Sequence, residues 1–200
     1  VESGDSSQYR WLQGLLEILE HAQSPEEFLE HTKLEMYSDQ VFCFTPRGGV
    51  IALPRNATSV DFAYALHTDV GHTCVGCKVN GRVTPLRTQL RNGDQVEILR
   101  SSEAAPDPAW ESFVVTGKAR AAIRRFVRAG QREDYRKLGQ AIAEKAFRES
   151  GHEFTDRALE NVLKIFDAQD ADDIFVQLGQ GHLTSRQLLA KVFPGERRWR

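Results

Sequence analysis

Residues 41–99 read VFCFTPRGGVIALPRNATSVDFAYALHTDVGHTCVGCKVNGRVTPLRTQLRNGDQVEIL, and this stretch decides the fold. Residues 41–45 and 50–53 are rich in β-branched and aromatic side chains, which favour strands. The four residues PRGG between them have the composition of a turn. The two runs therefore predict a β-hairpin.

A helix is predicted directly after this hairpin. Thr58 is a candidate N-cap, and Asp61 lies three residues further on, where its side chain can complete a capping box. Phe62, Ala65 and Leu66 follow at helical spacing. The pattern predicts a short helix that ends near Gly71.

Three more strands complete the stretch. Residues 74–79 have strand composition, Asn80-Gly81 is a strong two-residue hairpin signal, and residues 82–84 are predicted to return antiparallel. Residues 95–99 alternate polar and apolar side chains. The order β-β-α-β-β-β predicts an α+β chain with a β-grasp, ubiquitin-like domain, in which a five-stranded layer wraps the helix.

Helical patterns flank this domain. Residues 8–22 form an amphipathic pattern, and residues 25–36 follow Ser24, a candidate N-cap. These two helices bury too little surface to fold alone, so residues 1–38 are interpreted as the end of a larger domain. The polar, proline-rich residues 101–108 are predicted to be a linker.

The C-terminal part, residues 109–200, is predicted to be all helical. Residues 117–149 have helical periodicity, and a break near Gly130 favours two helices over one. Residues 155–166, 171–178 and 184–193 are three further amphipathic segments. Thr184 and Gln187 form a second capping-box pattern, which opens the last segment.

Composition limits the class of protein. Two hundred residues suit one domain with additions or two small domains. The sequence has no long apolar run, and it starts without a signal-peptide pattern, so a cytoplasmic protein is predicted. The net charge is −2, but residues 1–40 contain nine acidic and two basic side chains. Such an acidic segment is either a solvated helix face or a surface for a different partner.

The three cysteines do not form the pattern of a disulfide framework. Cys74 and Cys77 have C-x-x-C spacing, but residues three apart on a strand are expected to face opposite sides. No second pair completes four ligands, and Cys43 alone is not enough. We predict buried or half-buried thiols and no metal site.

Four motifs together resemble the TGS domain, named for threonyl-tRNA synthetases, certain GTPases and SpoT. They are VFCFTPRG, DFAYALHTDVGH, CVG-x-KVNGR and NGDQVEI. The flanking sequences FLEHTKLEMYSDQ and WESFVVTGKARAAIRRF resemble long bifunctional RelA/SpoT homologues. The resemblance implies an interior fragment with the end of a synthetase domain at 1–38, a TGS domain at 41–100, a linker at 101–108 and a helical domain at 109–200.

The resemblance also implies what the parent protein does. It would be a GTP pyrophosphokinase and guanosine-3′,5′-bis(diphosphate) 3′-diphosphatase that makes and destroys the alarmones of the bacterial stringent response, with Mg and Mn as cofactors. The fragment itself is expected to be non-catalytic and to need no cofactor. Its histidines have no adjacent aspartate of the HD kind, and residues 1–40 hold too few basic side chains for a nucleotide pocket.

A partner-binding site follows from the same resemblance. In ribosome-associated members the helix and hairpin face receive the 3′ end of deacylated tRNA, whereas in SpoT-like members the domain is implicated in binding acyl carrier protein. His67 is the central candidate, although it could equally be a capping or core histidine. Tyr64 and Phe62 could stack on a base or pack in the core. The candidate residues are His67, Tyr64, His72, Lys78, Arg82 and Arg47.

A run of basic residues after the TGS-like stretch forms a second candidate surface. Three of them recur at i, i+4 and i+8 and share one helical face, which could follow phosphates, contact an acidic protein segment or simply be solvated. The residues are Lys118, Arg120, Arg124, Arg125, Arg128 and Arg132.

These observations predict a regulatory module that binds a starvation-signalling partner and passes the signal to the catalytic domains. Three alternatives stay open. The partner is deacylated tRNA on the ribosome, it is a protein such as acyl carrier protein or the enzyme's own catalytic domains, or the module is only a spacer. No membrane partner is expected. The sequence motif AYALHTDVGH, which is similar to SpoT, slightly favours a parent protein with both synthetase and hydrolase activity.

Overall fold

The computed structural model describes residues 39–196, together with Gln13, Leu16 and residues 24–27. The chain divides into two compact units, Val1–Val127 and Arg128–Arg200, and each has a hydrophobic core. Both predicted N-terminal helices fall almost entirely outside the described residues. The predicted cap at Ser24 is present, because its Oγ accepts a hydrogen bond from the backbone N–H of Glu27 at 3.1 Å.

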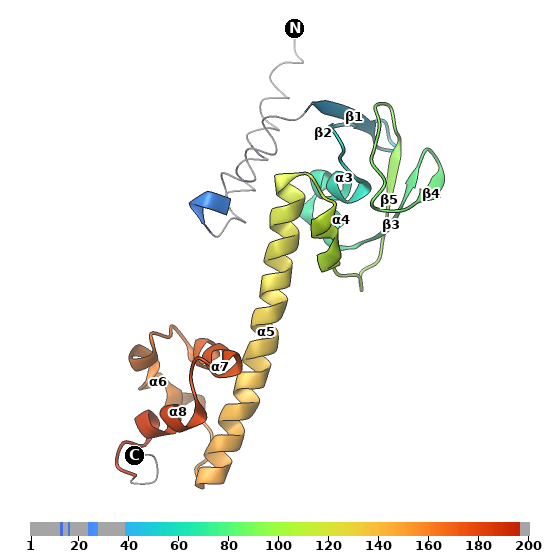
Figure 1. Ribbon diagram of the computed structural model, residues 1–200. Coiled ribbons are helices and arrows are strands. Elements are labelled where there is room, and N and C mark those ends of the chain that lie inside the picture. Colours follow the sequence, from blue (N-terminus) through green and yellow to red (C-terminus); the bar gives the residue numbers. More distant parts are fainter. Residues whose placement is uncertain (1–12, 14–15, 17–23, 28–38, 197–200) are drawn as a thin grey trace. The chain divides into compact units, whose positions relative to one another are not determined.

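Five strands of the first unit follow in the predicted order (Figure 1). Strands β1 (Gln40–Phe44) and β2 (Val50–Pro54) form the predicted antiparallel hairpin. Strand β3 (Cys74–Val79) lies between β4 (Arg82–Thr84) and β5 (Val96–Arg100) and is antiparallel to both. One parallel bridge, Phe44 to Gln95, joins the hairpin to the three-stranded sheet. The strand order β2-β1-β5-β3-β4 is that of the predicted β-grasp.

The tight turn between β3 and β4 has the conformation that its sequence predicts. Asn80 and Gly81 have φ angles of +53° and +81°. Two consecutive residues with positive φ make a type I′ turn, whose twist matches that of the flanking strands. The turn therefore fixes the register in which Val79 lies opposite Arg82.

Helix α3 (Ser59–Leu66) begins with the predicted capping box. The backbone N–H and the hydroxyl of Thr58 both donate to Asp61 Oδ2 at 2.9 Å. The predicted continuation to Gly71 is wrong, because the backbone at His67 is extended and a separate helix, α4 (Thr68–His72), follows. The two helices lie so close that a Cβ on Gly71 would be 2.3 Å from the ring of Tyr64.

Two clusters form the core of the first unit. Phe62 of α3 packs with Cys43, Leu53 and Val96 between the helix and the sheet. On the other side of α3, Tyr64 packs with a set of residues that reaches beyond the sheet, namely Val60, Ala63, Cys74, Trp110, Val114, Ala119, Ala122 and Ile123. The core of this unit therefore includes residues from outside the β-grasp stretch.

The predicted linker does not separate the compact units. The short 3-10 helix η1 (Pro108–Ser112) follows it, and Trp110 within η1 is only 8% exposed. The first unit continues to Val127 because Trp110 and the first turns of the next helix complete its core. The boundary lies within a helix, where the composition of the sequence has no linker signal.

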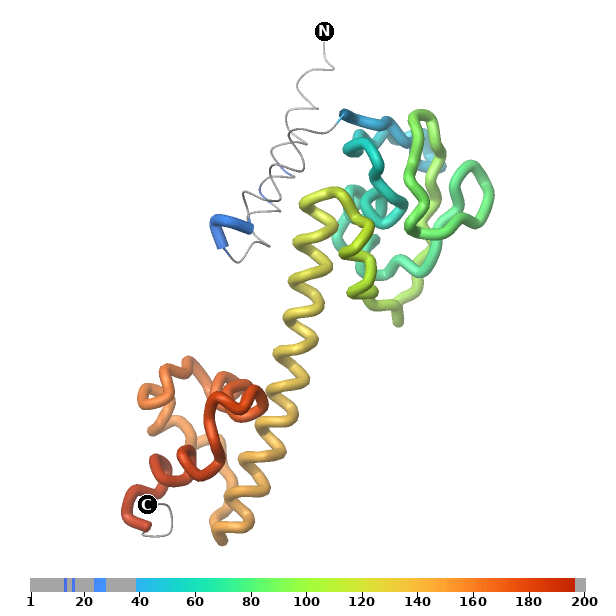
Figure 2. The backbone as a smooth tube through the Cα atoms, in the orientation of Figure 1, coloured from blue at the N-terminus to red at the C-terminus, as the bar shows by residue number. Residues whose placement is uncertain are grey.

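Helix α5 (Gly117–Ser150) is one continuous helix, so the predicted break near Gly130 is wrong (Figures 1 and 2). Gly130 is exposed, and no atom lies within 4 Å of the position where its Cβ would be. A glycine in such a position costs only about 1 kcal/mol relative to alanine. The cooperativity of a 34-residue helix outweighs that cost.

The second unit is helical, as predicted. The predicted segment 155–166 forms two short helices, α6 (Asp156–Glu160) and the 3-10 helix η2 (Leu163–Phe166). Helices α7 (Ala171–Gln180) and α8 (Ser185–Val192) follow, and the predicted capping box of Thr184 and Gln187 opens α8. The core combines the C-terminal half of α5 with these helices around Phe147, Leu159 and Ile174.

Candidate partner-binding surface

His67 lies at the junction of α3 and α4, and its side chain is 68% exposed. The ring is held from one side, because Nδ1 accepts a hydrogen bond from the backbone N–H of Asp69 at 3.1 Å. A neutral imidazole whose Nδ1 accepts carries its proton on Nε2. His67 therefore caps a helix, but its side chain caps the N-terminus of α4 and not the C-terminal helix end considered from the sequence. Its exposed aromatic ring can also stack or donate one hydrogen bond.

His72 and Tyr64 form a second, more buried pair. Tyr64 Oη lies 3.1 Å from Nδ1 of His72, and the His72 ring contacts Phe126 of α5 with ring centres 5.2 Å apart. Tyr64 is fully buried, and this burial raises the pKa of its hydroxyl. Of the two roles considered for Tyr64, the structure supports core packing and not contact with a partner, because the ring fills the core and is closed off by Gly71. His72 is half-buried.

The remaining predicted residues lie towards the other end of the sheet. Strand β3 starts at Cys74, opposite Arg100, and ends at Val79, opposite Val96. Its six residues span about 17 Å. His72 precedes the start of this strand, whereas Lys78 lies near its end and Arg82 is paired with Val79.

The basic side chains at that end differ in exposure. Arg82 is exposed, Lys78 is half-buried, and Arg47 is exposed in the turn between β1 and β2. That turn follows Phe44, which bridges to Gln95 at the start of β5. The structure therefore divides the predicted rim into a histidine end and an arginine end.

A buried carboxylate connects α3 to α5. Asp61 is fully buried, and its Oδ1 accepts from the backbone N–H of Thr116 at 2.9 Å and from the Thr116 hydroxyl at 2.7 Å. The backbone N–H of Val115 lies 3.1 Å from the same oxygen. Thr116 Oγ1 in turn accepts from the backbone N–H of Ala119 in the first turn of α5. From the sequence, Asp61 was assigned only its local role in the capping box.

Comparison with known proteins agrees with this architecture. The family model of the TGS domain matches residues 41–100, and that of the RelA/SpoT AH domain matches residues 126–193. The chain belongs to the RelA/SpoT family. It is 51% identical over 192 residues to the GTP pyrophosphokinase rsh of Brucella ovis, covering 96% of this chain and 26% of that protein.

Two further relatives extend the range of named activities. The GTP pyrophosphokinase of Myxococcus xanthus is 41% identical over 206 residues, covering 98% of this chain and 27% of that protein. The guanosine-3′,5′-bis(diphosphate) 3′-pyrophosphohydrolase of Vibrio cholerae is 40% identical over 179 residues, covering 88% and 25%. The chain thus spans about a quarter of the length of the relatives it matches.

The basic residues of α5 in this RelA/SpoT homologue are partly engaged within their own units. Arg120 donates to the carbonyl oxygen of Val114 at 3.1 Å, and Arg124 pairs with Glu111. In the second unit, Arg132 pairs with Asp173 at 2.6 Å. An RNA or protein ligand at the predicted basic face would compete with these acceptors. The role of this face, including Lys118, Arg125 and Arg128, stays a prediction.

The three cysteines are free and buried, as predicted, but Cys74 and Cys77 do not face opposite sides of the strand. A β-bulge between Cys74 and Gly76 shifts the register, so Cys74 and Cys77 are both buried instead of facing opposite sides. Their thiols donate to the carbonyl oxygens of Gly76 and Thr84. Burial raises the pKa of Cys74 to about 11, and burial with the nearby Asp94 charge has the same effect on Cys43.

Two further findings concern the described residues as a whole. Within them, no three His, Cys, Asp or Glu side chains are grouped closely enough to hold a metal ion. None of the helices in the described ranges combines the length and the hydrophobicity that a membrane-spanning segment needs.

Three arginines that the sequence analysis did not single out lie near one another. Arg55 follows β2, whereas Arg87 and Arg91 belong to the loop before β5, and all three line one hollow. Arg55 lies 32 positions before Arg87, so no spacing rule could connect the two loops. Only the β-grasp topology, which brings these loops together at the Thr58–Gln89 bridge, reveals the cluster.

Proposed function

We propose that this chain is a non-catalytic regulatory region of a stringent-response alarmone synthetase and hydrolase. Its TGS domain binds a starvation-signalling partner, and the signal passes to the catalytic domains of the parent protein. The names of the relatives support this proposal, since they include both a GTP pyrophosphokinase and a 3′-pyrophosphohydrolase. The partner favoured here is the unpaired 3′ end of deacylated tRNA.

The exposed, oriented ring of His67 is the observation that carries this proposal. Single-stranded nucleic acid is recognised by aromatic rings on which bases stack and by hydrogen bonds to base edges. The Asp69 N–H holds the His67 ring in place, so little conformational entropy is lost when a base stacks on it. Leu66, which is 37% exposed, adds apolar surface next to the ring.

A titration of the 200-residue chain with deacylated and aminoacylated tRNA tests this function. A free 3′ end fits a stacking site, whereas an esterified amino acid blocks it, so we expect at least tenfold tighter binding of deacylated tRNA. His67→Glu replaces the ring by an anion, and we expect about tenfold weaker binding, which is the usual size of one base–aromatic stack. His182→Glu is the matched control, because His182 is an exposed histidine of the second unit.

The outcomes separate the alternatives. Equal affinity for the two forms of tRNA, or equal losses in the two histidine variants, would contradict 3′-end recognition at His67. Steep salt dependence alone would not support it, since any basic surface that contacts phosphates has that property.

A protein partner is the second candidate, and the arginine end of the sheet favours it. Arg47 and Arg82 are exposed there, on a surface separate from His67. Acyl carrier proteins are acidic, so opposite charges would attract. If acyl carrier protein shifts the spectrum of this chain, Arg82→Glu should abolish the shift while His67→Glu leaves it unchanged.

A further inference from the structure

A cationic hollow lies on the TGS domain between β1, the loop after β2 and the loop before β5. Its volume is about 610 Å³, which is within the range of small-molecule sites. Arg55, Arg87 and Arg91 line it, together with polar side chains such as Asn56 and Gln89. No acidic residue is among the nine that line it. The hollow is separate from His67, since it adjoins the start of α3 and not its end.

The loop that carries Arg87 and Arg91 is tied to the rest of the domain. The backbone N–H of Leu90 donates to the carbonyl of Ala57 at 2.8 Å, and the Leu90 side chain is buried in the core. Asn92 Oδ1 accepts from the backbone N–H of Phe42 at 2.8 Å. A loop anchored on both sides of Arg91 loses little freedom when a ligand binds, which favours affinity.

Nearby acidic groups compete weakly for these arginines. Asp39 lies 3.9 Å from Arg55, but the two side chains are 87% and 71% exposed, and such pairs contribute little. The carboxylate of Asp94 accepts from the backbone N–H of Arg91 at 2.8 Å and from the amide of Asn80 at 2.9 Å. Its oxygens therefore already have donors.

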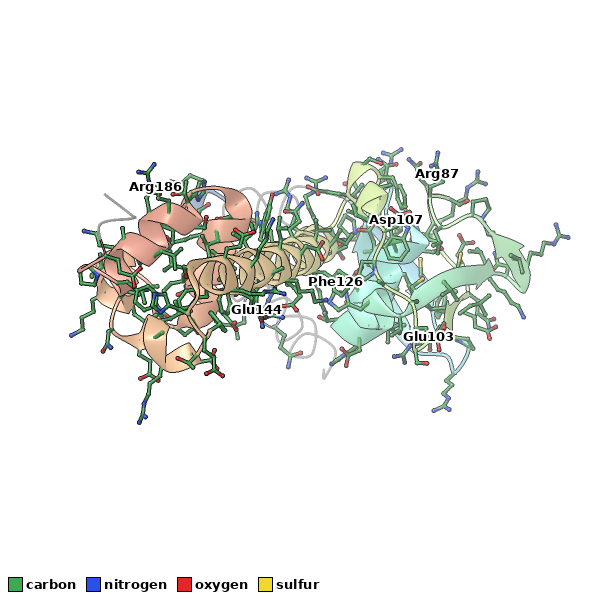
Figure 3. All side chains as sticks on the ribbon, turned by 90° about the horizontal axis from the view of Figure 1, so that it is seen from below. Arg87, Glu103, Asp107, Phe126, Glu144 and Arg186 are labelled. Atoms are coloured by element: carbon green, nitrogen blue, oxygen red, sulfur yellow. The ribbon has the colours of Figure 1, made fainter. Side chains whose placement is uncertain are left out.

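Arg87 is positioned by an aromatic ring. Its guanidinium carbon lies 5.9 Å from the ring centre of Phe113, within the range of a cation–π contact. Such a contact orients a guanidinium and does not occupy its N–H donors in hydrogen bonds. Figure 3 shows Arg87 extending from the surface of the domain, in agreement with its exposed side chain.

We propose that this hollow binds a small oligophosphate anion, such as the polyphosphate group of a nucleotide. Guanidinium groups recognise phosphate oxygens through paired N–H donors, and several arginines on anchored loops suit a ligand with several phosphates. The amide side chains of Asn56 and Gln89 supply neutral donors and acceptors next to the charges. The volume of this open hollow suits a small molecule rather than a long nucleic acid strand, which needs an extended groove.

Tripolyphosphate is the probe for this site. We would titrate it into the ¹⁵N-labelled 200-residue chain at constant ionic strength and follow amide shifts by NMR. The expected result is saturable binding at one site, with the largest shifts at residues 87–92. Arg91→Gln should weaken binding about fivefold, the size of one exposed ion pair, and the double variant Arg87→Gln, Arg91→Gln should abolish saturation.

Arg148→Gln is the matched control, because Arg148 is an exposed arginine of the second unit. Equal weakening in Arg91→Gln and Arg148→Gln, or shifts that rise linearly without saturation, would overturn the proposal. Sulfate at the same ionic strength must cause smaller shifts, since it is a single tetrahedral anion and cannot contact several arginines as three linked phosphates can. The result is independent of the function proposed for His67, because His67→Glu should bind tripolyphosphate normally and Arg91→Gln should retain selectivity for deacylated tRNA.

Discussion

Replacing Asp61 by asparagine should destabilise the first unit by about 3 kcal/mol. The carboxylate accepts from Thr58 through Oδ2 and from Thr116 through Oδ1, in each case from both a backbone N–H and a hydroxyl, and the N–H of Val115 reaches both oxygens. Asparagine keeps the shape but has one acceptor oxygen. In either orientation its NH₂ group faces a backbone N–H, of Thr58 or of Thr116.

The magnitude follows from these contacts. One buried donor left without an acceptor costs about 1–3 kcal/mol. The remaining bonds lose their charge assistance, at about 1 kcal/mol each. A neutral amide is less costly to bury than a carboxylate, which offsets part of this loss. A net loss of about 3 kcal/mol is a large fraction of the 5–15 kcal/mol that stabilises a typical domain.

Urea unfolding measures this loss. With an m-value of about 2 kcal/mol/M, the midpoint of the first unit should fall by about 1.5 M. The buried Trp110 reports on this unit when Trp11 and Trp199 are replaced by phenylalanine. Amide hydrogen exchange at Val115 and Thr116 should accelerate in parallel.

Asp69→Asn is the control, since that carboxylate is 75% exposed and its loss should change stability by less than about 0.5 kcal/mol. The reasoning about Asp61 is refuted if Asp61→Asn unfolds at the same urea concentration as this control. Unchanged protection of the Val115 and Thr116 amides would refute it equally.

Two further predictions concern α5 and the buried thiols. A Cβ on Gly139 would lie 1.6 Å from the carbonyl oxygen of Phe175, so Gly139→Ala should destabilise the second unit by about 2–3 kcal/mol in thermal unfolding. Gly130→Ala, with open space around it, should instead stabilise by about 0.5–1 kcal/mol, and equal effects of the two changes would contradict the packing described. Burial raises the thiol pKa of Cys43 and Cys74 from 9.0 to about 11, so stability of the first unit should be complete below pH 9 and fall as the pH rises towards 11, because only the unfolded thiols ionise there. Iodoacetamide at pH 8 should label these thiols at least about 100-fold faster in urea than in the folded chain, and equal labelling rates would contradict their burial.

The β-grasp domain could be predicted because its signals are local. The Asn80-Gly81 turn, the Thr58 capping box and the alternation of β5 each depend on residues close in sequence. The helix break at His67 could not be predicted in this way. There, a side-chain cap on α4 and the close approach of Gly71 to Tyr64 override a continuous helical pattern.

The candidate sites were harder to predict because they depend on contacts between distant residues. Tyr64 has an aromatic side chain that could stack on a base. Only its packing with Trp110 and Ile123 shows that it belongs to the core. Glycine is a helix-breaking residue type, but nothing in the surroundings of Gly130 requires a break. The arginine hollow depends on loops that meet only in the folded domain.

The Asp61 network bears on the signal relay proposed above, because it ties α3 to the start of α5. Allosteric coupling free energies are typically 1–3 kcal/mol. Breaking the bonds from Asp61 to Val115 and Thr116 would leave buried backbone donors without an acceptor, at about 1–3 kcal/mol each. To separate α3 from the start of α5, the partner proposed at His67 would have to supply a differential affinity at the upper end of this range or beyond it. We therefore expect helix α3 and the first turn of α5 to move as one body, and we place any hinge outside the bonds of Asp61.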